Sequence, residues 1–216
     1  MSKSALRRAL VVIDVQNEYF EGGGLPIAHP PVSQTLPNVV RAMDAARAAG
    51  VLVVVVVQHQ APAGAPVFQL DTPHGQLHPE VARRVADHHI TKTFPSVFTG
   101  TDLADWLAQQ HINTLTVAGY MTHNCNASTV FEAMHRGLAV EYLADASGAL
   151  PYANAAGQAT AEEIHRVFSV VFHSNFAAVV STRDWIQAVQ AGVGLEKDNV
   201  LMSNRRARAD QVAAAL

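Results

Sequence analysis

The only cysteine of the chain, Cys125, lies in the stretch 119–128, GYMTHNCNAS. This stretch follows a short apolar run, 115–118, and precedes apolar residues at helical spacing, so Cys125 is predicted between a strand and a helix. Unpaired N–H groups and the positive dipole at a helix N-terminus favour a thiolate, the nucleophilic form of cysteine. Position alone fits a nucleophile and a small buried apolar residue equally well.

A carboxylate and an amine stand at the ends of two other predicted strands, as Asp14 after the apolar run 9–13 and Lys92 near the end of the run 88–93. Burying a carboxylate costs free energy, so an Asp at a buried strand end suggests a function. An Asp that caps its own turn would explain its presence there equally well. Together with Cys125 they form a nucleophilic set. The thiolate would attack, the carboxylate would act as general base and acid, and the ammonium would stabilise the charged forms. Backbone N–H groups near Cys125 could hold an oxyanion.

Strand and helix patterns alternate along the whole chain. Apolar runs predict strands at 9–13, 51–57, 88–93, 115–118, 139–143 and 176–180, and a capping box, TAEE at 160–163, predicts a helix start. This order predicts an α/β fold in which a parallel, doubly wound sheet has helices on both faces and binds ligands at the carboxyl ends of its strands. We expect one domain over 1–195. The polar segment 196–216 would either fray or serve as an arm for a neighbouring subunit.

Composition excludes several classes of protein. The chain has 216 residues, 49% of them hydrophobic and 15% charged, with a formal net charge of −3. It lacks the Lys/Arg cluster of a nucleic-acid-binding surface, and its longest strictly apolar run, 51–57, is too short to span a membrane. One cysteine allows no intrachain disulfide, and the N-terminus has no signal-peptide pattern, so we expect a cytoplasmic protein.

Three motifs resemble those of the isochorismatase-like cysteine hydrolases: VIDVQN at 12–17, Lys92 before PSVF at 95–98, and GYMTHNC at 119–125. The similarity extends to about Ala191. It implies a three-layer α/β/α sandwich with a six-stranded sheet and a catalytic triad of Asp14, Lys92 and Cys125. It also implies a cis peptide bond between Tyr120 and Met121, which turns the Met121 N–H toward the oxyanion beside that of Cys125.

The chain departs from the nicotinamidases, which carry an Asp-x-His pair and a further His after the second strand to bind a metal. Here that position reads Gln58-His59-Gln60, so the carboxylate and the second ligand are missing. A single histidine is poor support for a metal site. The chain resembles the metal-free, N-carbamoylsarcosine amidase-like branch, for which we expect neither a metal nor another cofactor.

The resemblance predicts hydrolysis of a C–N bond, in an amide, ureido or lactam-like small molecule, through a thioester. One alternative is isochorismatase-type enol-ether hydrolysis, which does not need the cysteine, and another is non-enzymatic small-molecule binding on the same scaffold. Homo-oligomers, dimers or tetramers, are usual in this superfamily. The predicted substrate pocket consists of Tyr19, Phe20, Gln58, His59, Phe94, Phe98, Tyr120 and Asn124. Tyr152 could close over it.

Overall fold

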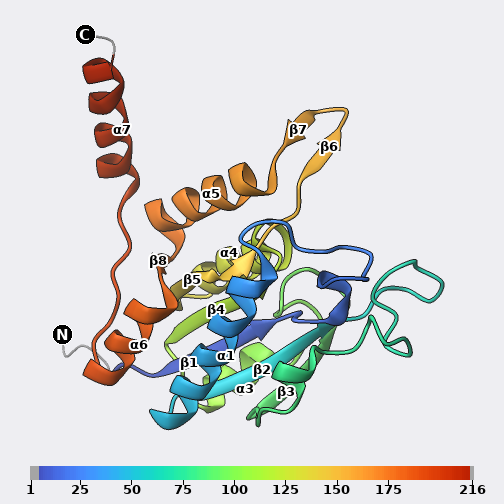
Figure 1. Ribbon diagram of the computed structural model, residues 1–216. Coiled ribbons are helices and arrows are strands. Elements are labelled where there is room, and N and C mark those ends of the chain that lie inside the picture. Colours follow the sequence, from blue (N-terminus) through green and yellow to red (C-terminus); the bar gives the residue numbers. More distant parts are fainter. Residues whose placement is uncertain (1–4, 215–216) are drawn as a thin grey trace.

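The computed structural model describes residues 5–214, which form a central sheet covered by helices (Figure 1). The sheet order is β3-β2-β1-β4-β5-β8, and every neighbouring pair is parallel. The strands are β1 (Arg8–Ile13), β2 (Leu52–His59), β3 (His88–Lys92), β4 (Thr114–Tyr120), β5 (Ala139–Gly148) and β8 (Ala178–Val180). The predicted α/β fold with a parallel sheet flanked by helices is confirmed.

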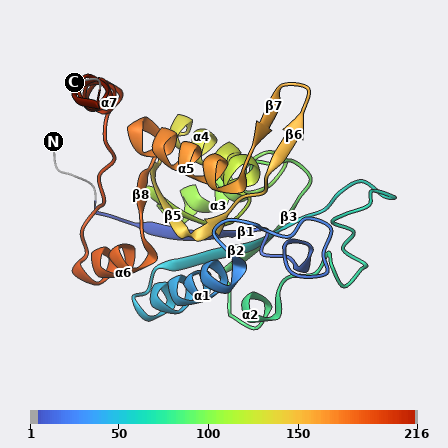
Figure 2. The ribbon, with the colours of Figure 1, turned by 45° about the horizontal axis from the view of Figure 1, so that its top comes forward.

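Helices cover both faces of this sheet (Figure 2). They are α1 (Val32–Ala48), α2 (Pro79–Ala82), α3 (Leu103–Gln109), α4 (Ala127–His135), α5 (Ala161–Val171), α6 (Thr182–Ala191) and α7 (Val200–Ala214). Successive residues of β1 point to opposite faces. Leu10 and Val12 share a core with α1 and α6, whereas Val11 and Ile13 share the other with α3 and α4.

The centre of the sheet brings the first strand beside the segment that leads to Cys125. Ile13 pairs with Gly119 across β1 and β4, and a Cβ on Gly119 would lie 2.1 Å from the Ile13 carbonyl oxygen. Gly119 also has a φ of 108°, which side chains rarely allow. A glycine is therefore required here, directly beside Asp14.

A Gly119→Ala variant is expected to lose roughly 2–4 kcal/mol of unfolding free energy, because the added methyl meets backbone and the positive φ is strained. Urea denaturation measures the loss. Gly137→Ala is the matched control, since Gly137 has a φ of 83° and nothing within 4 Å of an added Cβ. It should lose only about 1 kcal/mol. Equal losses in the two variants would contradict the close approach of β1 and β4.

Two segments differ from the sequence predictions. The tail at 196–216 contains a helix, α7, over Val200–Ala214 instead of a frayed chain. A small antiparallel hairpin, β6 (Tyr152–Asn154) and β7 (Gly157–Ala159), leads into α5. The capping box at the start of α5 is confirmed, since Thr160 and Glu163 exchange both of its hydrogen bonds. Within residues 5–214, none of the helices has the length and apolar character needed to cross a membrane.

Candidate active site

The structure brings Asp14, Lys92 and Cys125 together at the carboxyl edge of the sheet. The Lys92 Nζ lies 2.8 Å from Asp14 Oδ2 and donates a hydrogen bond to Cys125 Sγ at 3.2 Å. Asp14 directly follows β1, Lys92 ends β3, and Cys125 lies in the turn after β4. All three are buried, with at most 4% of any residue exposed. The ammonium therefore bridges a carboxylate and a thiol away from water, where such contacts are strong.

Lys92 is held in place by two further groups. It donates to the carbonyl oxygen of Phe94 at 3.2 Å and lies 3.5 Å from Nδ1 of His59. The His59 backbone is fixed in turn by the Gln16 side chain, which accepts from its N–H at 2.8 Å and donates to its carbonyl at 3.0 Å. Gln16, within the VIDVQN motif, thus positions the strand end beside Lys92, a role that sequence reasoning missed.

The protonation of the site follows from its burial and charges. Burial raises the pKa of the Cys125 thiol, and nearby Asp14 raises it further, whereas Lys92 opposes them. Burial by itself would lower the pKa of Lys92, but Asp14 and Cys125 outweigh this effect and raise it. A thiolate beside the Asp14–Lys92 ion pair would add a second buried negative charge. The resting site therefore holds a neutral thiol and an ammonium.

Cys125 is presented by η2 (Thr122–Asn126), a wide π-helical turn that precedes α4. Asn126 Nδ2 donates to the Gly119 carbonyl at 2.8 Å, and Thr122 Oγ1 donates to the Gly148 carbonyl at 3.1 Å. These bonds tie the turn to β4 and β5. The Tyr120–Met121 peptide bond at its start is cis, as the resemblance implies. An oxyanion-binding role for the Met121 and Cys125 N–H groups remains a prediction.

Two of the predicted pocket residues, Tyr120 and Phe98, belong to the hydrophobic core. Tyr120 is fully buried, and its hydroxyl lies 2.7 Å from Thr35 Oγ1 on α1. Phe98 is 4% exposed and packs beneath the guanidinium of Arg136 at 5.0 Å. Both side chains are occupied by packing, as is that of Tyr19, and substrate contacts of all three stay predictions.

The remaining pocket candidates surround the cluster to different degrees. Tyr19 is 1% exposed and packs on Phe68, and its pKa is raised by burial and then by Cys125 and Asp14, which places it close to them. Phe20 packs against His78 with the two rings tilted by 39° and their centroids 4.4 Å apart. Of the other candidates, Gln58, His59 and Asn124 are half-buried and Phe94 is exposed. Their substrate contacts stay predictions.

His123, two residues before Cys125, was missed by the sequence reasoning. Its ring lies 4.8 Å from that of Tyr152, almost perpendicular to it, and both ring nitrogens are buried without a hydrogen-bond partner. Burial lowers the pKa of His123 to about 4, so the ring is neutral near pH 7. Burial raises the pKa of Tyr152, and Cys125 contributes to the rise. Tyr152 thus contacts the residue two positions before Cys125, and its closing over the pocket stays a prediction.

The described residues contain no group of three His, Cys, Asp or Glu side chains arranged to hold a metal. A metal at the His59 Nδ1 would also face the Lys92 ammonium 3.5 Å from that nitrogen. Like charges at this separation repel strongly in a half-buried site. The residues present do not fit the metal site of the nicotinamidases.

A parallel sheet with a buried carboxylate, ammonium and thiol at its carboxyl edge is the framework of a hydrolase, and comparison with known proteins agrees. The family model described as "Isochorismatase domain" matches residues 8–184, and the chain belongs to this family. Its members and structural neighbours include hydrolases, so this protein is a hydrolase.

Three similar proteins illustrate the range of the family. The solved structure of a Burkholderia xenovorans LB400 protein assigned to the isochorismatases is 59% identical, with a TM-score of 0.94, and the match covers 97% of this chain and 100% of that one. The secreted isochorismatase effector Isc1 of Verticillium dahliae is 34% identical over 64% of this chain and 71% of its own length. Streptothricin hydrolase of Streptomyces noursei is 31% identical over 60% of this chain and 45% of its own.

Proposed function

We propose that this isochorismatase-family hydrolase cleaves a C–N bond of a small amide, ureido or lactam-like molecule through a thioester on Cys125. The observation that carries the proposal is the contact of Lys92 Nζ with both Cys125 Sγ, at 3.2 Å, and Asp14 Oδ2, at 2.8 Å. An enol-ether hydrolase has no use for a buried thiol joined to an acid–base pair. Nucleophilic catalysis needs this combination.

In the proposed reaction, Asp14 takes the proton of the Cys125 thiol as Sγ attacks the carbonyl carbon. Lys92 stabilises the negative charge that forms on sulfur, and the N–H groups of Met121 and Cys125 donate to the oxyanion. Asp14 then returns the proton to the leaving nitrogen, the C–N bond breaks, and a thioester remains. Water, deprotonated by Asp14, hydrolyses the thioester and restores the thiol.

Within the family, we propose the metal-free branch that resembles N-carbamoylsarcosine amidase. The Gln58-His59-Gln60 sequence and the position of Lys92 beside His59 Nδ1 support this choice. Nicotinamide, whose ring nitrogen binds the metal in nicotinamidases, is therefore not the proposed substrate. One relative is named streptothricin hydrolase, which is consistent with a hydrolytic reaction. A cytoplasmic location stays a prediction, since the Verticillium relative is a secreted protein.

Trapping of the covalent intermediate tests this function. A panel of primary amides, carbamoyl amines, lactams and vinyl ethers is incubated with the protein, and intact-mass spectrometry follows acid quenching. A substrate that turns over should leave an acyl adduct, and peptide mapping should place it on Cys125. Turnover of a vinyl ether with no adduct would instead support enol-ether hydrolysis. No turnover and no binding of any panel member would count against both.

A further inference from the structure

Lys92 and Cys125 come from strands that are not neighbours in the sheet. The order β3-β2-β1-β4 places two strands between β3, which ends at Lys92, and β4, which leads to Cys125. Neighbouring strands lie about 4.8 Å apart, so β3 and β4 are separated by about 14 Å. Pairing of the strands therefore does not by itself set the 3.2 Å contact between Lys92 Nζ and Cys125 Sγ. Another connection must hold these two ends of the site together.

The loop at 93–99, which directly follows Lys92, provides one side of such a connection. The Phe94 carbonyl in this loop accepts a hydrogen bond from Lys92 Nζ at 3.2 Å, so the position of the loop affects the position of the ammonium. The loop belongs to no helix or strand, yet its Val97 is fully buried. Buried backbone groups outside regular structure need partners from elsewhere in the protein.

A single hydroxyl on α4 joins this loop to the nucleophile. Thr129 Oγ1 donates to the Cys125 carbonyl at 2.7 Å and accepts from the Val97 N–H at 3.3 Å. Thr129 is fully buried, so water does not compete for either bond. A hydroxyl has one proton to donate and lone pairs that accept, and the two bonds use both properties. Thr129 thus links the residue that attacks to the loop that holds its ammonium partner.

Glu132 holds the same loop from the next turn of α4. Ser96 Oγ donates to Glu132 Oε2 at 2.5 Å, and the Thr99 hydroxyl donates to the same oxygen at 3.3 Å. Arg136 pairs with the other carboxylate oxygen at 2.6 Å. The Glu132 side chain is 27% exposed, so water can replace part of these contacts. Thr129 is the fully buried connection of the two, and its loss cannot be compensated by water.

We propose that Thr129 is a positioning residue, which sets the contact of Lys92 with Cys125 by joining the loop at 93–99 to the turn of the nucleophile. Glu132 supports this connection from the surface. The inference rests on the proposed function, because the thiolate that Lys92 stabilises is the nucleophile of the thioester reaction. It also assigns a physical role to the sequence PSVF at 95–98, whose backbone is the part that α4 holds.

Two substitutions at position 129 separate the hydroxyl from the shape of the side chain. Thr129→Val has nearly the same shape without the hydroxyl, and Thr129→Ser keeps the hydroxyl. Cys125 is the only cysteine, so intact-mass spectrometry after timed treatment with iodoacetamide at pH 8 measures its reactivity alone. Without the connection, Lys92 stabilises the thiolate less, and Thr129→Val should react about threefold or more slowly than the wild type. Thr129→Ser should react within about twofold of it, because both hydrogen bonds remain possible.

The direction of the change distinguishes positioning from a general loss of stability. Unfolding exposes a buried thiol, so destabilisation alone would make alkylation faster. An unchanged or faster reaction of Thr129→Val would therefore overturn the proposal. A Thr129→Ser variant that reacts as slowly as Thr129→Val would overturn it too, since the hydroxyl would then not be the group that matters.

Thr116→Val is the matched control. Thr116 is also fully buried, and its hydroxyl likewise donates one bond, to Glu141 Oε2 at 2.7 Å, and accepts one, from Trp185 Nε1 at 3.0 Å. These partners lie on β5 and α6, not on the loop at 93–99. Urea denaturation should show a loss of stability in both valine variants. Thr116→Val should nevertheless be alkylated at the wild-type rate or faster, and a slowing equal to that of Thr129→Val would contradict the assignment.

Steady-state kinetics with any substrate found in the panel gives a second measurement. Thr129→Val should lower kcat about tenfold or more and leave KM within about twofold, because a displaced ammonium affects the transition state more than the binding of substrate. An unchanged kcat would overturn the proposal. Alkylation needs no substrate, so its result stands by itself. A Cys125→Ala variant that keeps turnover would remove the proposed function, whereas only the Thr129 and Thr116 variants decide the positioning.

Discussion

A Cys125→Ala variant is expected to hydrolyse an amide substrate at least about 10⁴ times more slowly than the wild type, because no other group in the site can form the thioester. Only the small, buried Sγ is lost, so the free energy of unfolding should change by about 1 kcal/mol. Steady-state kinetics on any substrate found in the panel measures the first effect, and urea denaturation measures the second.

The same variant separates the candidate reactions. Enol-ether hydrolysis with Asp14 as the acid does not need the thiol, so a Cys125→Ala protein with unimpaired turnover would exclude the thioester route. Substrate that still binds with an unchanged Kd, but is not cleaved, would agree with the loss of a nucleophile. An Asn126→Asp variant would not distinguish the two reactions. Asn126 fixes the turn that carries Cys125 by donating to the Gly119 carbonyl, so its replacement would disturb the turn in either case.

Asp14→Asn is expected to lower turnover by about 10²–10⁴-fold and, in the opposite sense, to make the thiol more reactive toward iodoacetamide. Turnover falls because an amide cannot take the thiol proton. Reactivity rises because Asp14 is one of the groups that raise the Cys125 pKa, whereas Lys92 remains to stabilise the thiolate. Loss of the neighbouring negative charge lowers the thiol pKa, so alkylation at pH 8 should accelerate about tenfold or more.

Lys92→Met provides the contrasting variant. Without the ammonium the thiol pKa rises further, so turnover and alkylation should both fall, and the thiolate absorbance near 240 nm should appear only at higher pH than in the wild type. If Asp14→Asn slowed alkylation as Lys92→Met does, the carboxylate would be stabilising the thiolate. The assignment of Asp14 as the base would then be wrong.

The buried strands were the most predictable part of the molecule. The run 9–13 became β1 over Arg8–Ile13, and 115–118 became the middle of β4 over Thr114–Tyr120. Continuous apolar and β-branched runs specify such strands because both faces are covered. The grouping of the residues at the strand ends could also be predicted, because the carboxyl ends of parallel strands lie along one edge of the sheet.

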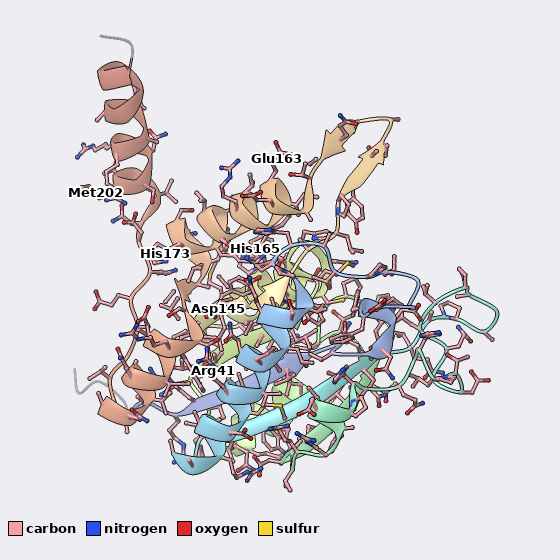
Figure 3. The ribbon with its side chains drawn as sticks, in the orientation of Figure 1. Arg41, Asp145, Glu163, His165, His173 and Met202 are labelled. Atoms are coloured by element: carbon pink, nitrogen blue, oxygen red, sulfur yellow. The ribbon has the colours of Figure 1, made fainter. Side chains whose placement is uncertain are left out.

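Features that depend on distant contacts escaped the sequence reasoning. The segment after 143 was expected to turn, yet β5 continues to Gly148. Asp145 lies where the pairing of β5 with β4 shifts register, and its Oδ1 accepts bonds from the N–H and the hydroxyl of Thr182, both at 2.7 Å. The two residues are 37 positions apart in the chain, and the bonds connect Asp145, which is labelled in Figure 3, to the first residue of α6. The N-cap of α6 is Ser181, whose side chain accepts from the Asp184 N–H.

Helix α7 and the burial of Tyr120 were missed for other reasons. The segment that forms α7 begins with three consecutive large apolar residues, at 200–202, and continues in mostly polar sequence, so it has no apolar repeat of helical period. The sequence around Tyr120 contains no sign that its hydroxyl contacts Thr35 on α1, 85 residues away in the chain. Local sequence cannot distinguish these cases, because the deciding groups lie far away in the chain.

The central position of β1 has a consequence for synthesis of the protein. Of the six strands in this sheet, β1 is made first, but one of its two neighbours, β4, begins only at Thr114. Until β4 pairs, β1 has a free apolar edge of the kind that recruits strands from other chains. The nascent chain therefore passes through an aggregation-prone stage of roughly a hundred residues, and Asp14 meets Cys125 only when that stage ends.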